Sequence, residues 1–211
     1  MVGVLLVLLG GAQVAPATIA PDPVLLHVRV YADRGVGRST VERSQAVARR
    51  LLMSAGIDLV WRLCEPSAVC DLGTRPPREI TVVLSADALT NGFEVCGRAA
   101  IGARGGRGTV RVSVPCVAGV AARLAVSGGG KAHPLLKVLG YDDVLGAVEA
   151  HELGHVLGLK HARGVMRTRL DANDILALRL GILVFSASQS ARMRALLAKP
   201  AGEELARGRE P

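Results

Sequence analysis

Three histidines within eleven residues place the strongest constraint on how this chain can fold. The stretch Val148–Met166 reads VEAHELGHVLGLKHARGVM. His151 and His155 are four residues apart, so on a helix their side chains share one face and can reach one ion. Gly158 can adopt the left-handed conformation that ends a helix. The sequence therefore predicts a helix ending near Gly158 and a turn that brings His161 back as a third ligand.

Glu152 directly follows the first histidine and is rotated about 100° from it around the helix axis. This places the carboxylate beside the ion, where it can take a proton from metal-bound water. Imidazole ligands with a neighbouring carboxylate suit zinc, and three protein ligands leave one position of a tetrahedral ion open. We therefore predict a catalytic zinc site with Glu152 as general base. Glu149, on the same helix, is expected to face away from the histidines and to be solvated.

These residues resemble the signature of the metzincin clan of zinc endopeptidases, H-E-x-x-H-x-x-G-x-x-H followed by a methionine turn. Five positions match that signature, namely His151, Glu152, His155, Gly158 and His161. The resemblance implies that the three histidines bind zinc, that Glu152 is the base and that Met166 lies beneath the metal. Only four residues separate His161 from Met166, a tighter turn than most metzincins use. The chain looks most like a matrixin-type catalytic domain or a secreted bacterial relative of one.

The same resemblance implies an α+β fold: a small mixed β-sheet with a backing helix, an active-site helix and a C-terminal helical lobe. Residue patterns agree, because they predict a strand, a helix and then four more strands before the histidine helix. The predicted strands are 25–31, 58–64, 79–84, 96–103 and 109–114. The predicted helices are 39–56, one that begins near 141, 171–180 and 186–198. On the histidine helix, Val144 and Val148 should face a cleft, while Gly146 and the apolar residues beside it should pack against the sheet.

Four cysteines, an even number, suggest two disulfides formed in an oxidising compartment. Three connectivities are possible, and the sequence does not choose between them. We favour Cys64–Cys70 and Cys96–Cys116, because each pair brackets a plausible loop between extended segments. A structural zinc site made of cysteines is disfavoured, since no C-x-x-C spacing is present.

The N-terminus is typical of an export signal. An apolar run, Val2–Leu9, precedes Ala15-Pro16-Ala17, which fits an A-x-A cleavage site; a buried core segment is the alternative interpretation. The predicted organisation is a signal peptide over 1–17, a catalytic domain over 18–198 and a flexible tail over 199–211. The apolar run is shorter than the roughly 20 residues that a spanning helix needs. We therefore expect a secreted or periplasmic protein that is not inserted in the membrane once the signal is removed.

Composition narrows the choice of partner. The net charge is +8, but aromatic residues make up only 2% of the chain, and the basic residues are scattered without aromatic neighbours. Nucleic-acid binding is therefore not expected. The sequence predicts a monomeric, secreted zinc-dependent endopeptidase that acts on protein or peptide. The competing hypothesis is a disulfide-stapled secreted binding protein in which zinc is structural or catalysis has been lost.

Overall fold

The computed structural model describes residues 22–65, 70, 78–87, 96–102, 107–126 and 140–199. The strands are β1 (Val24–Ala32), β2 (Ile57–Cys64), β3 (Glu79–Ser85), β4 (Gly97–Ile101) and β5 (Gly108–Ser113). The helices are α1 (Arg38–Ser54), α2 (Val114–Val126), α4 (Tyr141–Val156), α5 (Ala172–Arg179) and α6 (Ala187–Ala198), with a 3-10 turn, η1, at Gly164–Met166. The predicted α+β class is confirmed. Helix α2 was not predicted.

The five strands form one mixed sheet in the order β2-β1-β3-β5-β4. The first four of these strands are parallel, and β4 runs antiparallel to β5 along one edge. Alternate residues of each central strand are buried, as for Leu26 and Val28 in β1 and Ile80 and Val82 in β3. This period of two shows that only one face of the sheet carries the main core.

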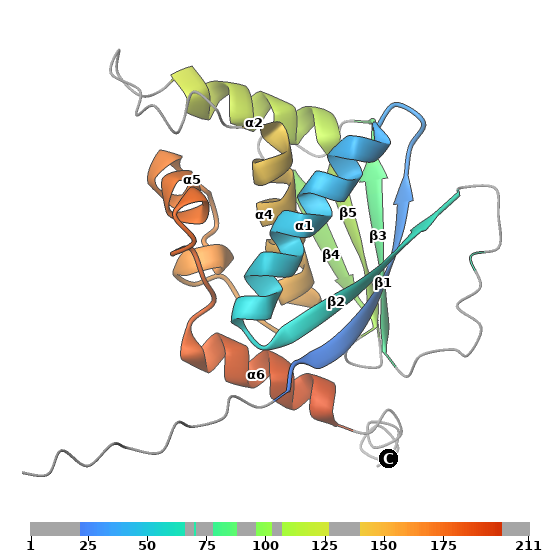
Figure 1. Ribbon diagram of the computed structural model, residues 1–211, viewed down its shortest axis with the longest axis vertical. Coiled ribbons are helices and arrows are strands. Elements are labelled where there is room, and N and C mark those ends of the chain that lie inside the picture. The colour runs from blue at the N-terminus through green and yellow to red at the C-terminus, as the bar shows by residue number, and fades with distance from the viewer. Residues whose placement is uncertain are drawn as a thin grey trace, which may run out of the picture.

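Figure 1 shows that the helices gather on that one side of the sheet. Helices α1 and α4 cross in contact there, and α4 also packs on β4 and β5. Helix α2 lies across one end of this layer, and α6 crosses the opposite end beside β1. Helix α5 lies beyond α4, away from the sheet. The histidine helix is therefore enclosed by α1, α2 and the edge of the sheet, as a rigid scaffold for a site requires.

The contact between α1 and α4 corrects two expectations. Gly146 approaches α1 and not the sheet, because a Cβ atom there would lie 2.4 Å from the carbonyl oxygen of Ser44 and 2.6 Å from Val47 Cβ. Glu149 is not solvated: only 1% of it is exposed, and its Oε1 lies 2.9 Å from Ser44 Oγ. Both residues lie on the α1 side of α4. The helix is therefore buried on the face opposite the histidines as well as against the sheet.

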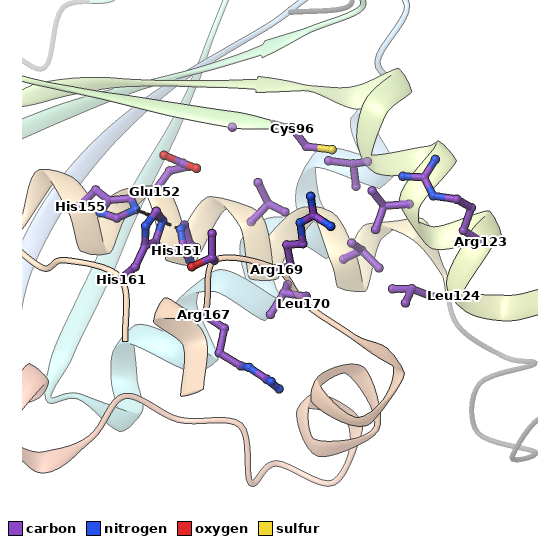
Figure 2. Close-up of a pocket in the computed structure, with 16 residues that line it drawn as sticks. Cys96, Arg123, Leu124, His151, Glu152, His155, His161, Arg167, Arg169 and Leu170 are labelled. Carbon is purple, nitrogen blue, oxygen red and sulfur yellow. Dashed lines mark hydrogen bonds between the residues drawn. The ribbon is translucent and has the colours of Figure 1, made fainter. Parts of the chain in front are cut away.

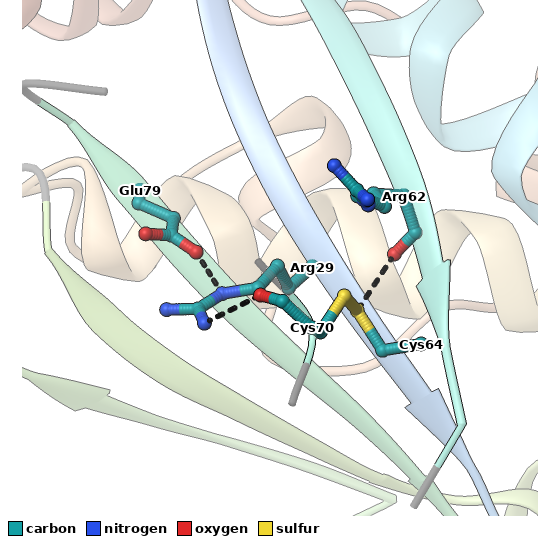
Figure 3. Close-up of a disulfide and its surroundings, with 5 residues drawn as sticks. All are labelled: Arg29, Arg62, Cys64, Cys70 and Glu79. Carbon is teal, nitrogen blue, oxygen red and sulfur yellow. Dashed lines mark hydrogen bonds and ion pairs between the residues drawn. A yellow bond between two sulfur atoms is a disulfide. The ribbon is translucent and has the colours of Figure 1, made fainter. Parts of the chain in front are cut away.

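Both favoured disulfides are present. Cys64–Cys70 joins the last residue of β2 to Cys70 on the outer face of the sheet (Figure 3). There Cys70 O accepts a hydrogen bond from Arg29, which also pairs with Glu79. Cys96–Cys116 joins the residue before β4 to helix α2. The expectation that both pairs bracket loops between extended segments is wrong for the second pair, because Cys116 lies in a helix.

Several predictions concern residues outside the described part of the chain. The signal peptide predicted over 1–17 lies there, and so does the predicted tail beyond Lys199. Among the residues that the structure describes, no helix is both long and apolar enough to cross a bilayer.

Candidate active site

The three predicted histidines meet at one point. His155 Nε2 lies 3.0 Å from His151 Nε2 and 3.2 Å from His161 Nε2, and one nitrogen from each ring can be chosen so that all three lie within 4.8 Å of one another. His151 and His155 come from α4, while His161 comes from the loop that follows it (Figure 2). The structure thus brings together three residues that can hold one metal ion.

Backbone carbonyls fix the orientation of the first two rings. His151 Nδ1 lies 2.8 Å from the carbonyl oxygen of Val165, and His155 Nδ1 lies 2.9 Å from that of Leu159. A carbonyl only accepts, so each Nδ1 must carry the ring hydrogen and donate it. In the neutral rings the Nε2 atoms then carry lone pairs, and all of these lone pairs point to the meeting point. Burial lowers the pKa of His151 to about 4, which keeps its ring neutral. A cation at the meeting point would satisfy these lone pairs.

The turn after α4 makes this arrangement possible. Gly158 has a φ of +82°, its N–H donates to His155 O, and the N–H of Leu159 donates to Gly154 O. These two bonds form a Schellman motif with glycine in the left-handed position. The motif ends the helix within one turn of His155 and reverses the chain toward His161. It also places the Leu159 carbonyl against His155, so one turn both recruits the third histidine and orients the second.

Met166 lies directly under the histidine helix. Its side chain is fully buried, and a Cβ atom on Gly154 would lie 2.6 Å from its Sδ. The loop from His161 closes on itself, because the N–H of Ala162 donates to Met166 O across 2.8 Å. The tight spacing noted in the sequence is therefore accommodated by a short closed loop. The residue before Met166, Val165, supplies the carbonyl that orients His151.

Glu152 lies beside the histidines with its carboxylate against β4. Only 7% of the residue is exposed, and burial raises the pKa of its carboxyl to about 7. Gly97 makes room for it: a Cβ atom there would lie 2.6 Å from Glu152 Cγ and Oε1. A carboxyl with a pKa near neutrality can both accept and return a proton at physiological pH. Gly97 was not identified from the sequence, because only the folded sheet edge brings it to the helix.

A pocket of about 490 Å³ opens next to the histidines and Glu152 (Figure 2). Its walls are mostly aliphatic, with residues from α2, α4 and the loop before α5: Val117, Val120, Leu124, Val144, Val148 and Leu170. The predicted cleft-facing position of Val144 and Val148 is confirmed. Cys96 also lines the pocket, so its disulfide to α2 ties the α2 wall to the start of β4. The α2 wall of the pocket was not predicted from the sequence. Its only signal was the spacing of Val117, Val120 and Leu124, which places them on one helical face.

Comparison with known proteins finds similarity in structure alone. No family model matches the sequence, and no curated protein matches it. Metalloproteinase-II from Bacteroides fragilis superposes with a TM-score of 0.51 at 13% identity, over 87% of this chain and 56% of that one. The chain shares its fold with that metalloproteinase. It spans little more than half of the metalloproteinase's length.

Two other structures match with lower TM-scores. The zinc-dependent peptidase from Methanocorpusculum labreanum matches with a TM-score of 0.46 at 14% identity, over 79% of this chain and 99% of its own. Archaemetzincin from Methanopyrus kandleri also matches with a TM-score of 0.46, at 15% identity, over 86% of this chain and 100% of its own.

Proposed function

We propose that this protein is a zinc-dependent endopeptidase. The observation that carries the proposal is the convergence of three imidazole nitrogens, two of them oriented by backbone carbonyls, beside a buried carboxyl of raised pKa. The shared fold with a bacterial metalloproteinase supports it. A site with three protein ligands and an adjacent acid is the arrangement of a catalytic zinc centre, whereas a structural zinc site is closed by four ligands.

The donor set fits zinc. Ligand bonds of about 2.0–2.1 Å in a tetrahedral site place neighbouring nitrogens about 3.3 Å apart, close to the 3.0 and 3.2 Å found between the Nε2 atoms. His151, His155 and His161 would hold the ion. When bound, zinc supplies a Lewis acid that polarises a peptide carbonyl and makes water acidic near neutral pH.

Glu152 would move the proton in this reaction. As a carboxylate it accepts a proton from the attacking water, and as a carboxylic acid it delivers that proton to the departing amine nitrogen. Its pKa of about 7 lets both forms exist at neutral pH. Gly97 leaves the space in which the carboxylate stays, and the wall of β4 shields it from bulk water.

The edge of β4 offers a place for the substrate backbone. The N–H of Ser113 donates to Cys96 O, and the N–H of Gly102 donates to Arg107 O. In this register the even-numbered residues of β4 make the backbone hydrogen bonds with β5. By the alternation of an antiparallel ladder, Gly97 and Ala99 then turn their own N–H and C=O groups to the free edge. A peptide can add there as a further strand. Because Gly97 touches Glu152, such a peptide would pass the histidines.

We further propose roles for Met166 and Gly158 and a location for the protein. Met166 would support the metal site from beneath α4, and Gly158 would set the turn toward His161. The protein would be an exported, monomeric, matrixin-like peptidase, with a signal peptide over 1–17 and a catalytic domain over 18–198. The two disulfides are consistent with export.

The test combines metal content with a matched pair of variants. Purified protein should contain about one zinc per chain and cleave internal bonds of an unbiased peptide pool. Glu152→Gln should keep the zinc and lose activity by about two to four orders of magnitude. Glu149→Gln is the matched control, because it alters the other buried carboxyl of α4, on the α1 side of the helix, and should retain activity.

The outcomes separate the two hypotheses. A zinc-loaded wild-type protein that cleaves nothing in the pool would favour the structural-zinc binding protein. Near-normal turnover in Glu152→Gln would remove that residue from the proposed role. For the ligands, His161→Ala should lose zinc, whereas His27→Ala, on β1 away from the site, should retain it.

A further inference from the structure

The exposed apolar side chains of this protein are not spread evenly. Eight large hydrophobic residues are exposed in the described part of the chain, and five of them are distributed over β1, α1, β2 and β4. The other three, Leu180, Ile182 and Val184, lie close together between α5 and α6, and 56%, 67% and 41% of them is exposed. We call these three side chains the apolar stripe. Single exposed apolar residues are ordinary, whereas a contiguous group marks a surface that binds something.

Buried neighbours hold the stripe outward. Leu183 and Phe185 alternate with the exposed residues and belong to the hydrophobic core. Because side chains alternate along an extended chain, Ile182 and Val184 point outward when Leu183 and Phe185 point inward. Figure 1 shows the connection from α5 to α6 on the opposite side of the helices from the sheet. The stripe therefore cannot turn into the core unless Leu183 and Phe185 leave it.

The part of the chain that carries the stripe is also strongly basic. Residues 158–199, which we call the C-terminal lobe, contain eight Lys and Arg, two Asp and no Glu, a net charge of +6 out of +8 for the whole chain. Both of these acids already pair with Arg167. Three exposed cations of the lobe, Lys160, Arg163 and Arg192, form no ion pair with any residue that the structure describes.

The three cations are neighbours of the stripe. The turn that follows α4 carries two of them, and its last part touches the stripe, because a Cβ atom on Gly164 would lie 2.5 Å from Val184 O. The third, Arg192 of α6, reaches the start of the same turn, because a Cβ atom on Gly158 would lie 3.9 Å from its Nε. The stripe and the cations therefore surround one turn and form a single basic and apolar face.

We propose that this face docks on the surface of an anionic lipid membrane. Apolar side chains that enter the headgroup region, flanked by Lys and Arg that meet lipid phosphates, are the combination with which proteins bind a membrane surface without crossing it. The charge favours a lipid surface over a second copy of this chain, because two lobes of net charge +6 would repel each other. Lipid binding does not require peptidase activity, so this proposal and the proposed function can fail separately.

The experiment is co-sedimentation of the full chain with vesicles of phosphatidylcholine alone or with about one third phosphatidylglycerol. The anionic vesicles should bind more tightly, and binding should weaken as NaCl is raised from about 0.05 to 0.5 M. Ile182→Asn should weaken binding about tenfold, because the isoleucine side chain no longer leaves water. Val60→Asn is the matched control, because it alters an exposed β-branched residue on β2 and should change nothing. All variants keep the same N-terminus, so the differences between them report on this face.

Two triple variants separate a local patch from overall charge. One replaces the three cations of the face by glutamine and should weaken binding about 10²-fold, or about fivefold for each charge. The other removes the same number of exposed cations outside the lobe and should retain most of the binding. Its substitutions are Arg34→Gln, Arg50→Gln and Arg62→Gln. Because every altered residue is exposed, urea unfolding should show that both variants remain folded.

Three outcomes would overturn the proposal. Equal losses in the two triple variants would mean that binding follows net charge and not this face. Unchanged binding in Ile182→Asn would remove the apolar stripe from the contact. Failure of the wild type to bind anionic vesicles would exclude a lipid partner, and a dimer that Ile182→Asn dissociates would then assign the stripe to a second copy of the chain. None of these outcomes depends on whether the protein cleaves peptides.

Discussion

The replacement of Glu149 by glutamine should stabilise this protein more and more as the pH rises. Burial raises the pKa of Glu149 to about 8, and the hydrogen bond with Ser44 only partly opposes this. Ser44 Oγ also lies 3.0 Å from the carbonyl oxygen of Val41. A hydroxyl has one hydrogen, which Ser44 can donate either to Val41 O or to Glu149 Oε1, so this bond compensates the burial of a carboxylate only in part. The other oxygen, Oε2, is buried without a partner, which a carboxylate would tolerate poorly.

The direction and magnitude of the change in stability with pH follow from the raised pKa of Glu149. Because the folded value lies above the ordinary 4.5, the unfolded chain releases the proton first. The stability contributed by the neutral carboxyl is therefore complete below about pH 4.5 and is lost as the pH rises toward 8. At 1.36 kcal/mol per pH unit, the wild type should lose about 3–4 kcal/mol relative to Glu149→Gln between about pH 5 and pH 8.

Urea unfolding with the disulfides intact measures this difference. Both proteins are unfolded at several pH values with a chelator present, so that metal binding does not contribute. Comparison with the variant cancels the titration of the other groups. Ser44→Ala retains the carboxyl without its partner and should keep the pH dependence. Parallel stability curves for wild type and Glu149→Gln would refute the reasoning, because they would mean that Glu149 ionises in the folded protein as easily as in water.

Three further changes test other contacts. Gly97→Ala would place a Cβ atom 2.6 Å from the Glu152 side chain, which can move away by about 1 Å. We therefore expect normal stability and zinc content, but a kcat reduced about 10²-fold because the carboxylate is displaced. An unchanged kcat would contradict this. Gly146→Ala would place a Cβ atom 2.4 Å from the α1 backbone and should lower the free energy of unfolding in urea by about 1–3 kcal/mol. Gly181→Ala, with open space around it, should lower it by only about 1 kcal/mol, through the strain of a left-handed alanine. Equal losses in the two variants would argue against the clash. His155→Ala should abolish the rise in Tm that zinc gives the wild type, and a retained rise would exclude it as a ligand.

Local features could be predicted from the sequence, but contacts between segments far apart in the chain could not. Helix α4 and the turn at Gly158 were predictable, because the four-residue histidine spacing and the glycine act within one short stretch. Glu149 was placed in solvent because its neighbour across the interface is Ser44, more than 100 positions earlier, and no periodicity reveals which face of a helix a second helix will cover. Gly97 beside Glu152 is a contact of the same kind.

Helix α2 was missed for a related reason. Its sequence, VPCVAGVAARLAV, begins directly after β5 with a proline at its second position, where a proline is tolerated in the first turn of a helix. Glycine and β-branched residues within it lower helix propensity, so packing and not local preference stabilises it. The cysteine pairing was predicted correctly, but Cys116 lies in helix α2 and not in an extended segment, so the second bond joins a sheet edge to a helix.

The histidine cluster depends on two turns as much as on its helix. A helix alone gives two imidazoles on one face, but it fixes neither ring. Leu159 O, in the Schellman turn, and Val165 O, in the turn before Met166, fix one ring each. The compressed spacing between His161 and Met166 therefore does not weaken the site, because the short loop is what holds Val165 against His151. It follows that metal affinity should respond to changes in these turns even where no ligand is altered, since each carbonyl sets the direction of a lone pair.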